Sequence, residues 1–279
     1  SQTVVPDEDE LADHYGSVAE EIGEDGVVFR TLDIGGDKYP PGIPLAHEEN
    51  PFLGLRGLRL LLKRAEDIAM PQLRALTRAA RRGTVKIMYP MVASTEDLEA
   101  ALKLAEEARE QVEDEVEGDA PEMEQGCMVE IPSVVHILPE LLERCDFASV
   151  GTNDLVQYTL AADRNSERMA ASYDPFHPAI LRALRRIREA GREKDTKISI
   201  CGETAGDTHF LPLLLGLGYD NLSVNVGSVP YVKRAVRRVS LEDCEELAQA
   251  ALDADTTGRI RALAEEFYDE YLHEPEEEE

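Results

Sequence analysis

The chain has 279 residues, of which 43% are hydrophobic, enough to bury the core of one large domain. Its formal net charge of −28, from 57 acidic and 29 basic residues, argues against nucleic acid as a partner, because a polyanion would be repelled. Lysine is scarce among the basic residues. This scarcity and the excess of negative charge favour a protein of a halophile over an acidic protein of a mesophile, because a salt-rich cytoplasm screens the repulsion between like charges.

Apolar runs and helical periodicities alternate along the chain. The apolar runs predict seven short strands, and the periodicities between them predict helices, one of them broken at Pro71. The predicted strands are Val27–Leu32, Phe52–Leu55, Val85–Tyr89, Cys127–Ile131, Phe147–Val150, Ile198–Cys201 and Leu222–Val226. The predicted helices are Leu58–Arg82, Thr95–Glu115, Ser133–Glu143, Pro178–Ala190, Thr208–Leu217, Val229–Val239, Leu241–Leu252 and Thr257–Leu272.

This alternation predicts parallel strands joined by helical crossovers. Eight such units close a TIM-type (β/α)8 barrel, so we expect an α/β barrel that lacks its first strand, which would lie upstream of residue 1. We expect residues 1–279 to form a single domain, with a lead-in helix in residues 1–25 and an acidic tail at residues 275–279.

Four cysteines, Cys127, Cys145, Cys201 and Cys244, show neither zinc-site spacing nor a disulfide framework. The chain also has no signal peptide and no long apolar segment, which indicates a soluble cytoplasmic protein. Of the four thiols, only Cys201 is predicted at the end of a strand beside a Gly turn. A cysteine in an apolar strand is usually a small core residue, but this position favours a catalytic role.

The most informative stretch is Ser149 to Arg164, where an apolar strand ends in the polar loop Gly-Thr-Asn-Asp. Asn153 and Asp154 offer an amide and a hard oxygen ligand for a divalent cation, and Arg164 supplies a planar cation for a carboxylate or phosphate. In a barrel, the polar residues at the C-terminal ends of the strands share one face. This face is therefore the predicted site.

Charged residues also stand in or after other predicted strands. Arg30 and Asp33 either form a structural ion pair, or Arg30 faces an anionic ligand. Their spacing alone leaves both possibilities open. Arg56 is likewise a charged residue that directly follows a predicted strand, Phe52–Leu55. Glu130 is a single carboxylate in an apolar strand and needs a cation, either Mg²⁺ shared with Asp154 or a barrel arginine.

Together these segments resemble the C-terminal, phosphoenolpyruvate-binding domain of Enzyme I of the bacterial phosphotransferase system. The segments that carry the resemblance are Arg30–Lys38, Glu49–Arg56, Met128–Pro132, Gly151–Arg164 and Cys201–Asp207. Pyruvate phosphate dikinase and phosphoenolpyruvate synthase are relatives of that family. Gln157–Leu160 and Cys201–Asp207 are more similar to Enzyme I than to either of them.

The resemblance implies a role for each site residue. It assigns phosphate binding to Arg30, Arg56 and Arg164, substrate contact to Asn153, and Mg²⁺ binding to Glu130 and Asp154. It makes Cys201 the acid that protonates the enolate carbon as pyruvate forms. In the family, the phosphoryl group moves to a histidine of a separate domain as the first step of sugar uptake, and none of the six histidines here matches it.

The implied function is thus a phosphoenolpyruvate–protein phosphotransferase that is incomplete without the phosphohistidine domain and works with a phosphocarrier protein. The family also implies a homodimer. Two alternatives are the equivalent domain of a phosphoenolpyruvate synthase or pyruvate phosphate dikinase, and a non-catalytic dimerisation or metabolite-sensing domain. The charged site residues argue against the latter, because buried unpaired charges are costly in a purely structural barrel.

Overall fold

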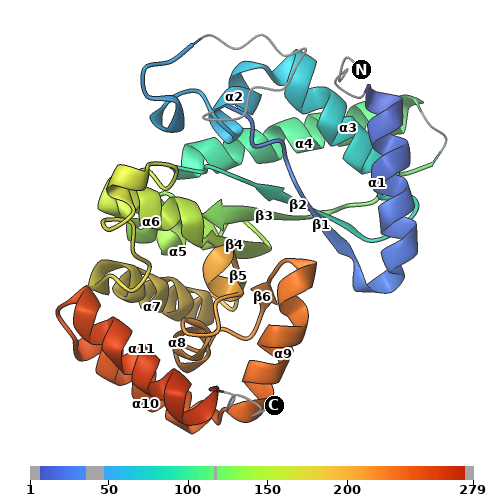
Figure 1. The fold of residues 1–279 in the computed structure, drawn as a ribbon. Coiled ribbons are helices and arrows are strands. Elements are labelled where there is room, and N and C mark those ends of the chain that lie inside the picture. Colours follow the sequence, from blue (N-terminus) through green and yellow to red (C-terminus); the bar gives the residue numbers. More distant parts are fainter. Residues whose placement is uncertain (1–6, 36–46, 116–117, 274–279) are drawn as a thin grey trace. The chain divides into compact units, whose positions relative to one another are not determined.

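The computed structural model describes residues 7–35, 47–115 and 118–273 (Figure 1). Contacts divide the chain into two compact units. The first unit contains residues 1–128 and 140–148, and the second contains residues 129–139 and 149–279. The expectation of a single domain stays a prediction, and the expected acidic tail lies outside the described residues.

Parallel strands form the centre of the first unit. Strand β1 (Val27–Arg30) pairs with β2 (Val85–Tyr89), which pairs in turn with β3 (Glu124–Val129), whose last residue belongs to the second unit. The register places Arg30 opposite Met88. Side chains of β2 alternate between buried and half-buried, so one face of the strand carries Val85, Ile87 and Tyr89 into the core.

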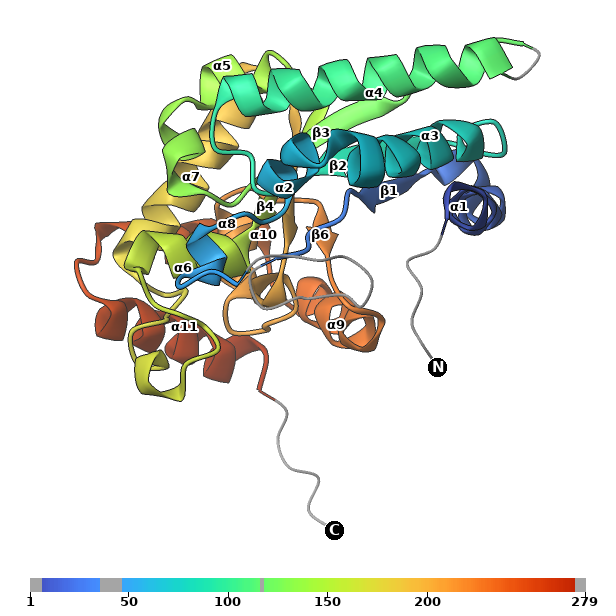
Figure 2. The same ribbon diagram turned by 90° about the horizontal axis from the view of Figure 1, so that it is seen from above.

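Helices cover this unit. Helix α1 (Glu8–Ile22) begins with a capping box between Asp7 and Glu10, and lies within the predicted lead-in segment. Helix α3 (Met70–Ala79) packs against both α1 and α4 (Thr95–Glu115) (Figure 2). The helix predicted over residues 58–82 is interrupted before Pro71: α2 (Leu58–Lys63) ends, a π-helical turn follows at Ala65–Ala69, and the proline then occupies the first turn of α3.

The second unit repeats the alternation. It contains the end of β4 (Phe147–Gly151), together with β5 (Lys197–Cys201) and β6 (Leu222–Ser223), the last two paired in parallel. Two short helical segments, a 3₁₀ turn at Pro132–His136 and α5 (Leu138–Leu142), lie between β3 and β4. The remaining helices are α6 (Thr152–Leu160), α7 (Pro178–Glu193), α8 (Leu211–Gly216), α9 (Val229–Arg238), α10 (Leu241–Asp253) and α11 (Thr257–Tyr271).

Apolar side chains fill the interior of each unit. Leu60 and Leu76 are fully buried in the first unit, as are Ile180 and Ile200 in the second. Each such side chain stabilises its unit by roughly 1.5–3 kcal/mol relative to leaving it in water. Among the described helices, none combines the length and apolar character needed to span a bilayer.

The predicted fold class is confirmed. The described residues form an α/β fold in which strands follow one another in chain order, as in a (β/α) barrel that lacks strands. Six of the seven predicted strands are present. The prediction for Phe52–Leu55 is wrong, because Pro51 and Gly54 bracket a 3₁₀ turn at Pro51–Leu53.

Candidate functional site at the strand ends

The C-terminal end of β4 carries the polar segment that the sequence analysis singled out. The segment is not a loop, because α6 begins at Thr152, directly after Gly151. Asp154 lies in the first turn of this helix and is only 6% exposed. Its Oδ2 lies 3.5 Å from Nη1 of Arg164. The structure therefore brings together two of the predicted site residues, one carboxylate and one guanidinium.

Cys201 ends β5 in the same unit. Its thiol donates a hydrogen bond to the backbone carbonyl of Val150, with a sulfur–oxygen distance of 3.3 Å. Gly202 follows with φ of +111°, a conformation that favours glycine, and a Cβ there would lie 2.4 Å from Oγ1 of Thr152. The thiol is thus placed at the predicted strand end, beside the first residues of α6.

The amide of Asn153 links the two strand ends. Its Oδ1 accepts a hydrogen bond from the backbone N–H of Glu203 at 3.1 Å, and its Nδ2 donates to Oε1 of Glu203 at 3.5 Å. The hydroxyl of Tyr173 donates to the Asn153 carbonyl at 3.2 Å. Burial raises the pKa of Tyr173 to about 12, so this donor keeps its proton at neutral pH.

The carboxylates of the second unit fit a magnesium ion by their chemistry. Glu130 follows β3, is only 1% exposed and is, with Asp154, one of two buried carboxylates predicted as ligands. Within the part of the chain that the structure describes, no group of three or more His, Cys, Asp or Glu side chains could hold a metal. Mg²⁺ usually takes one or two protein carboxylates, with water and substrate oxygens completing the octahedron. Glu130 and Asp154 therefore match the type of protein ligand that Mg²⁺ takes.

Two of the predicted arginines lie in the first unit. Arg56 forms a buried, bidentate ion pair with Asp33, with Nε–Oδ1 and Nη2–Oδ2 distances of 3.1 and 3.0 Å. Arg30, at the end of β1, bonds the sulfur of Met128 at 3.9 Å. Asp33, for which the sequence left a structural pair with Arg30 open, pairs with Arg56 in the structure.

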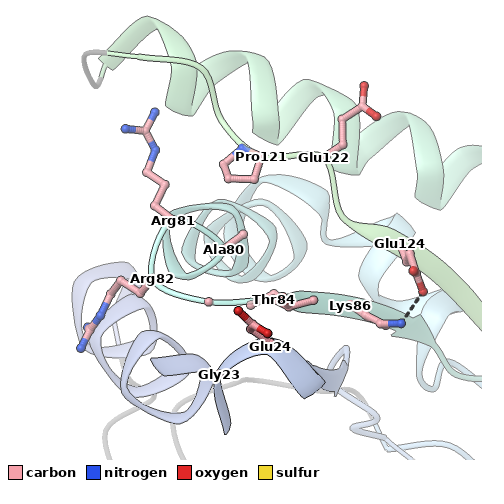
Figure 3. A pocket seen from close by; sticks show the side chains of 12 residues that line it. Gly23, Glu24, Ala80, Arg81, Arg82, Thr84, Lys86, Pro121, Glu122 and Glu124 are labelled. Carbon is pink, nitrogen blue, oxygen red and sulfur yellow. Dashed lines mark hydrogen bonds and ion pairs between the residues drawn. The ribbon is translucent and has the colours of Figure 1, made fainter. Parts of the chain in front are cut away.

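A pocket of about 600 Å³ lies at the other ends of these strands, where β1, β2 and β3 begin (Figure 3). Its charged lining is mixed: Arg81, Arg82 and Lys86 lie among three glutamates, and Lys86 pairs with Glu124 at 2.5 Å. Active sites of this fold class lie at the C-terminal ends of the strands. This pocket is therefore not the predicted site.

Sequence reasoning missed three contributors to the β4 and β5 strand ends: Thr152, Tyr173 and Thr204. The two threonines stand inside Gly151–Arg164 and Cys201–Asp207, but a hydroxyl beside amide and carboxylate residues carries little chemical signal of its own. Tyr173 is remote from both segments in the sequence. It is found only once the chain between α6 and α7 has folded back.

Two histidines make structural contacts in the second unit. His177 caps α7, since its Nδ1 accepts a hydrogen bond from the backbone N–H of Ala179 at 3.1 Å. His209 stacks on Tyr268, with a ring-centre distance of 3.9 Å. All four cysteines are free thiols in the structure.

The fold and these strand ends define an α/β domain of the class that binds ligands at the C-terminal ends of its parallel strands. The family model "PEP-utilising enzyme, PEP-binding domain" matches residues 1–241, and the chain belongs to this family of phosphoenolpyruvate-utilising enzymes. The resemblance stated from the sequence is thus confirmed.

Three curated relatives illustrate the similarity. The chain is 43% identical over 263 residues to a phosphoenolpyruvate-protein phosphotransferase of Staphylococcus carnosus, covering 94% of this chain and 46% of that protein. It is 40% identical over 264 residues to the Bacillus subtilis protein of the same name, covering 95% and 46%. A Salmonella typhimurium relative, named phosphoenolpyruvate-dependent phosphotransferase system, is 42% identical over 261 residues, covering 93% and 35%. The chain therefore spans less than half the length of these relatives.

Proposed function

We propose that this chain binds phosphoenolpyruvate with Mg²⁺ and forms the catalytic part of a phosphoenolpyruvate–protein phosphotransferase. The family match over residues 1–241 carries the proposal. The hydrogen-bonded ends of β4 and β5 support it, because they hold a thiol, an amide and a carboxylate in one unit. The names of the relatives favour a protein phosphotransferase over a phosphoenolpyruvate synthase or pyruvate phosphate dikinase.

Each charged residue has a defined part in binding. Arg30, Arg56 and Arg164 bind the substrate phosphate, since guanidinium groups match phosphate oxygens in geometry and charge. Asn153 contacts the substrate through its amide. Glu130 and Asp154 hold Mg²⁺, which, when bound, neutralises charge on the transferring phosphoryl group and on the enolate.

The reaction has two bond exchanges. The phosphoryl group leaves the enol oxygen as the P–O bond breaks, and a P–N bond forms to a histidine of a separate domain. The electron pair of the resulting enolate takes the proton of Cys201 at carbon, so the S–H bond breaks and the methyl group of pyruvate forms. The thiolate is then reprotonated from solvent.

The setting of this activity follows from the same resemblance. The acceptor histidine domain and a phosphocarrier protein are the partners, and sugar uptake is the process served. We propose that the chain acts as a homodimer in the cytoplasm of a halophile, where the net charge of −28 is screened by salt. Neither a nucleic acid nor a membrane is a partner in this scheme.

Calorimetric titration of phosphoenolpyruvate into the chain in molar KCl, with and without Mg²⁺, tests the proposal. We expect binding that requires Mg²⁺ and that is lost in Glu130→Gln, a variant that keeps the shape of the side chain but removes its charge. Glu122→Gln, at the pocket on the other ends of the strands, is the matched control and should bind as the unaltered chain does. Folded protein, shown by circular dichroism, that binds equally well in Glu130→Gln would refute the metal assignment.

A further inference from the structure

Two buried hydroxyl groups form a relay that ends on the backbone of Cys201. The hydroxyl of Thr204 donates to Oγ1 of Thr152 at 2.8 Å, and the Thr152 hydroxyl donates to the carbonyl oxygen of Cys201 at 3.1 Å. Thr152 and Thr204 are only 1% and 6% exposed. Since a hydroxyl has a single proton, the donor order is fixed from Thr204 through Thr152 to Cys201.

Cys201 is held through its backbone and its side chain at the same time. While the Cys201 carbonyl accepts from Thr152, the Cys201 thiol donates to the carbonyl of Val150, two residues before Thr152 in the chain. The close approach at Gly202 leaves no room for a Cβ between these groups. The side chain of Thr152 therefore holds the backbone of Cys201, and the thiol extends from that backbone toward Val150.

Thr204 holds the side chain of Thr152 in place through its hydrogen bond. A valine at position 204 would occupy nearly the same volume but could not donate to Thr152, whereas a serine could. The hydroxyl of Thr204 touches no group to which the proposed reaction assigns chemistry, so any effect it has on Cys201 passes through Thr152.

We propose that Thr204 is a positioning residue, which through Thr152 holds the backbone of Cys201 at the position from which its thiol protonates the enolate carbon. This inference rests on the proposed function, because only an acid with a defined target benefits from a fixed position. In the structure the thiol donates to the Val150 carbonyl, and the relay keeps the end of β5, which carries the thiol, beside that carbonyl.

The test compares Thr204→Val with Thr204→Ser by the rate at which iodoacetamide alkylates Cys201 at one fixed pH, followed peptide by peptide with mass spectrometry. We expect alkylation to be about fivefold faster in Thr204→Val, because loss of the relay weakens the hydrogen bond from the thiol to the Val150 carbonyl. In Thr204→Ser we expect the original rate. Cys145, in the other unit, serves as an internal reference and should not change.

Thr77→Val is the matched control, since it removes another buried hydroxyl, one bonded at 2.9 Å to the Leu73 carbonyl in the first unit. It should leave the Cys201 rate unchanged. Equal rates in Thr204→Val and the unaltered chain, or failure of Thr204→Ser to restore the rate, would overturn the proposal. Titration of the same samples with phosphoenolpyruvate tests the proposed function independently. A chain that binds no substrate would refute that function, while the alkylation rates alone test the relay.

Discussion

The two units hold their predicted site residues by different means. In the first unit, Arg56 is fixed by a buried ion pair with Asp33. In the second unit, the partly exposed Arg164 pairs with Asp154, and the ends of β4 and β5 are joined by neutral groups: two threonine hydroxyls, an amide and a thiol.

This contrast has an energetic consequence. Breaking a buried ion pair leaves an uncompensated charge in a low dielectric, while losing one neutral hydrogen bond removes about 1 kcal/mol. Loss of the Asp33–Arg56 pair in the first unit should therefore cost more than loss of one hydrogen bond at the ends of β4 and β5 in the second. Variants of each unit can show whether that difference is real.

The largest expected effect is that of Asp33→Ala. The change leaves the Arg56 guanidinium buried without its carboxylate, and we expect the free energy of unfolding to fall by about 3–5 kcal/mol in urea denaturation. Asp67→Ala removes a carboxylate from an exposed pair with Arg64 and should change nothing measurable. A loss below about 1 kcal/mol for Asp33→Ala would remove the proposed difference between the units.

A smaller effect is expected from Gly202→Ala in the second unit. The new Cβ would meet Oγ1 of Thr152 at a backbone φ of +111°, so we expect a loss of about 1–3 kcal/mol in the same assay. Gly227→Ala is the control, because that glycine has no left-handed φ and its nearest group, Oδ1 of Asn225, would lie 3.4 Å away. Equal stability of the two variants would show that the turn after β5 is not tightly held.

The smallest effect concerns alkaline pH. Burial raises the pKa of Tyr173 to about 12, above that of an unfolded tyrosine near 10. The folded chain then keeps a proton that the unfolded chain loses, so this contribution to stability is complete below pH 10 and declines as the pH rises toward 12. Difference titration of tyrosinate absorbance against Tyr173→Phe should show one group that titrates near pH 12; a midpoint near 10 would mean that this phenol is not buried.

Regular elements with clear periodicity could be predicted from the sequence. The strand Val85–Tyr89 and the helix Thr95–Glu115 have the predicted bounds, because alternation and the 3.6-residue repeat leave little choice. Segments with mixed signals were harder. Phe52–Leu55 is apolar, yet Pro51 and Gly54 turn it into a 3₁₀ segment, and Gly-Thr-Asn-Asp has the composition of a loop although it begins α6.

The candidate site shows the same limit. The residue types at the strand ends were visible in the sequence, because charges in apolar strands are conspicuous. Partner choice was not visible: Asp33 is close to Arg30 in the chain but pairs with Arg56, 23 residues away. The relay from Thr204 to Thr152 spans 52 residues, and no local pattern predicts a contact at that separation.

The central claim, that Cys201 is the acid of a phosphoenolpyruvate-binding site, is tested most directly by hydrogen exchange of pyruvate. The acid that protonates the enolate must, in reverse, remove a methyl proton, so pyruvate incubated with the chain and Mg²⁺ in D₂O should lose its methyl signal in proton NMR. We predict exchange at least about 100-fold slower in Cys201→Ala. Exchange at an unchanged rate in that variant would contradict the account.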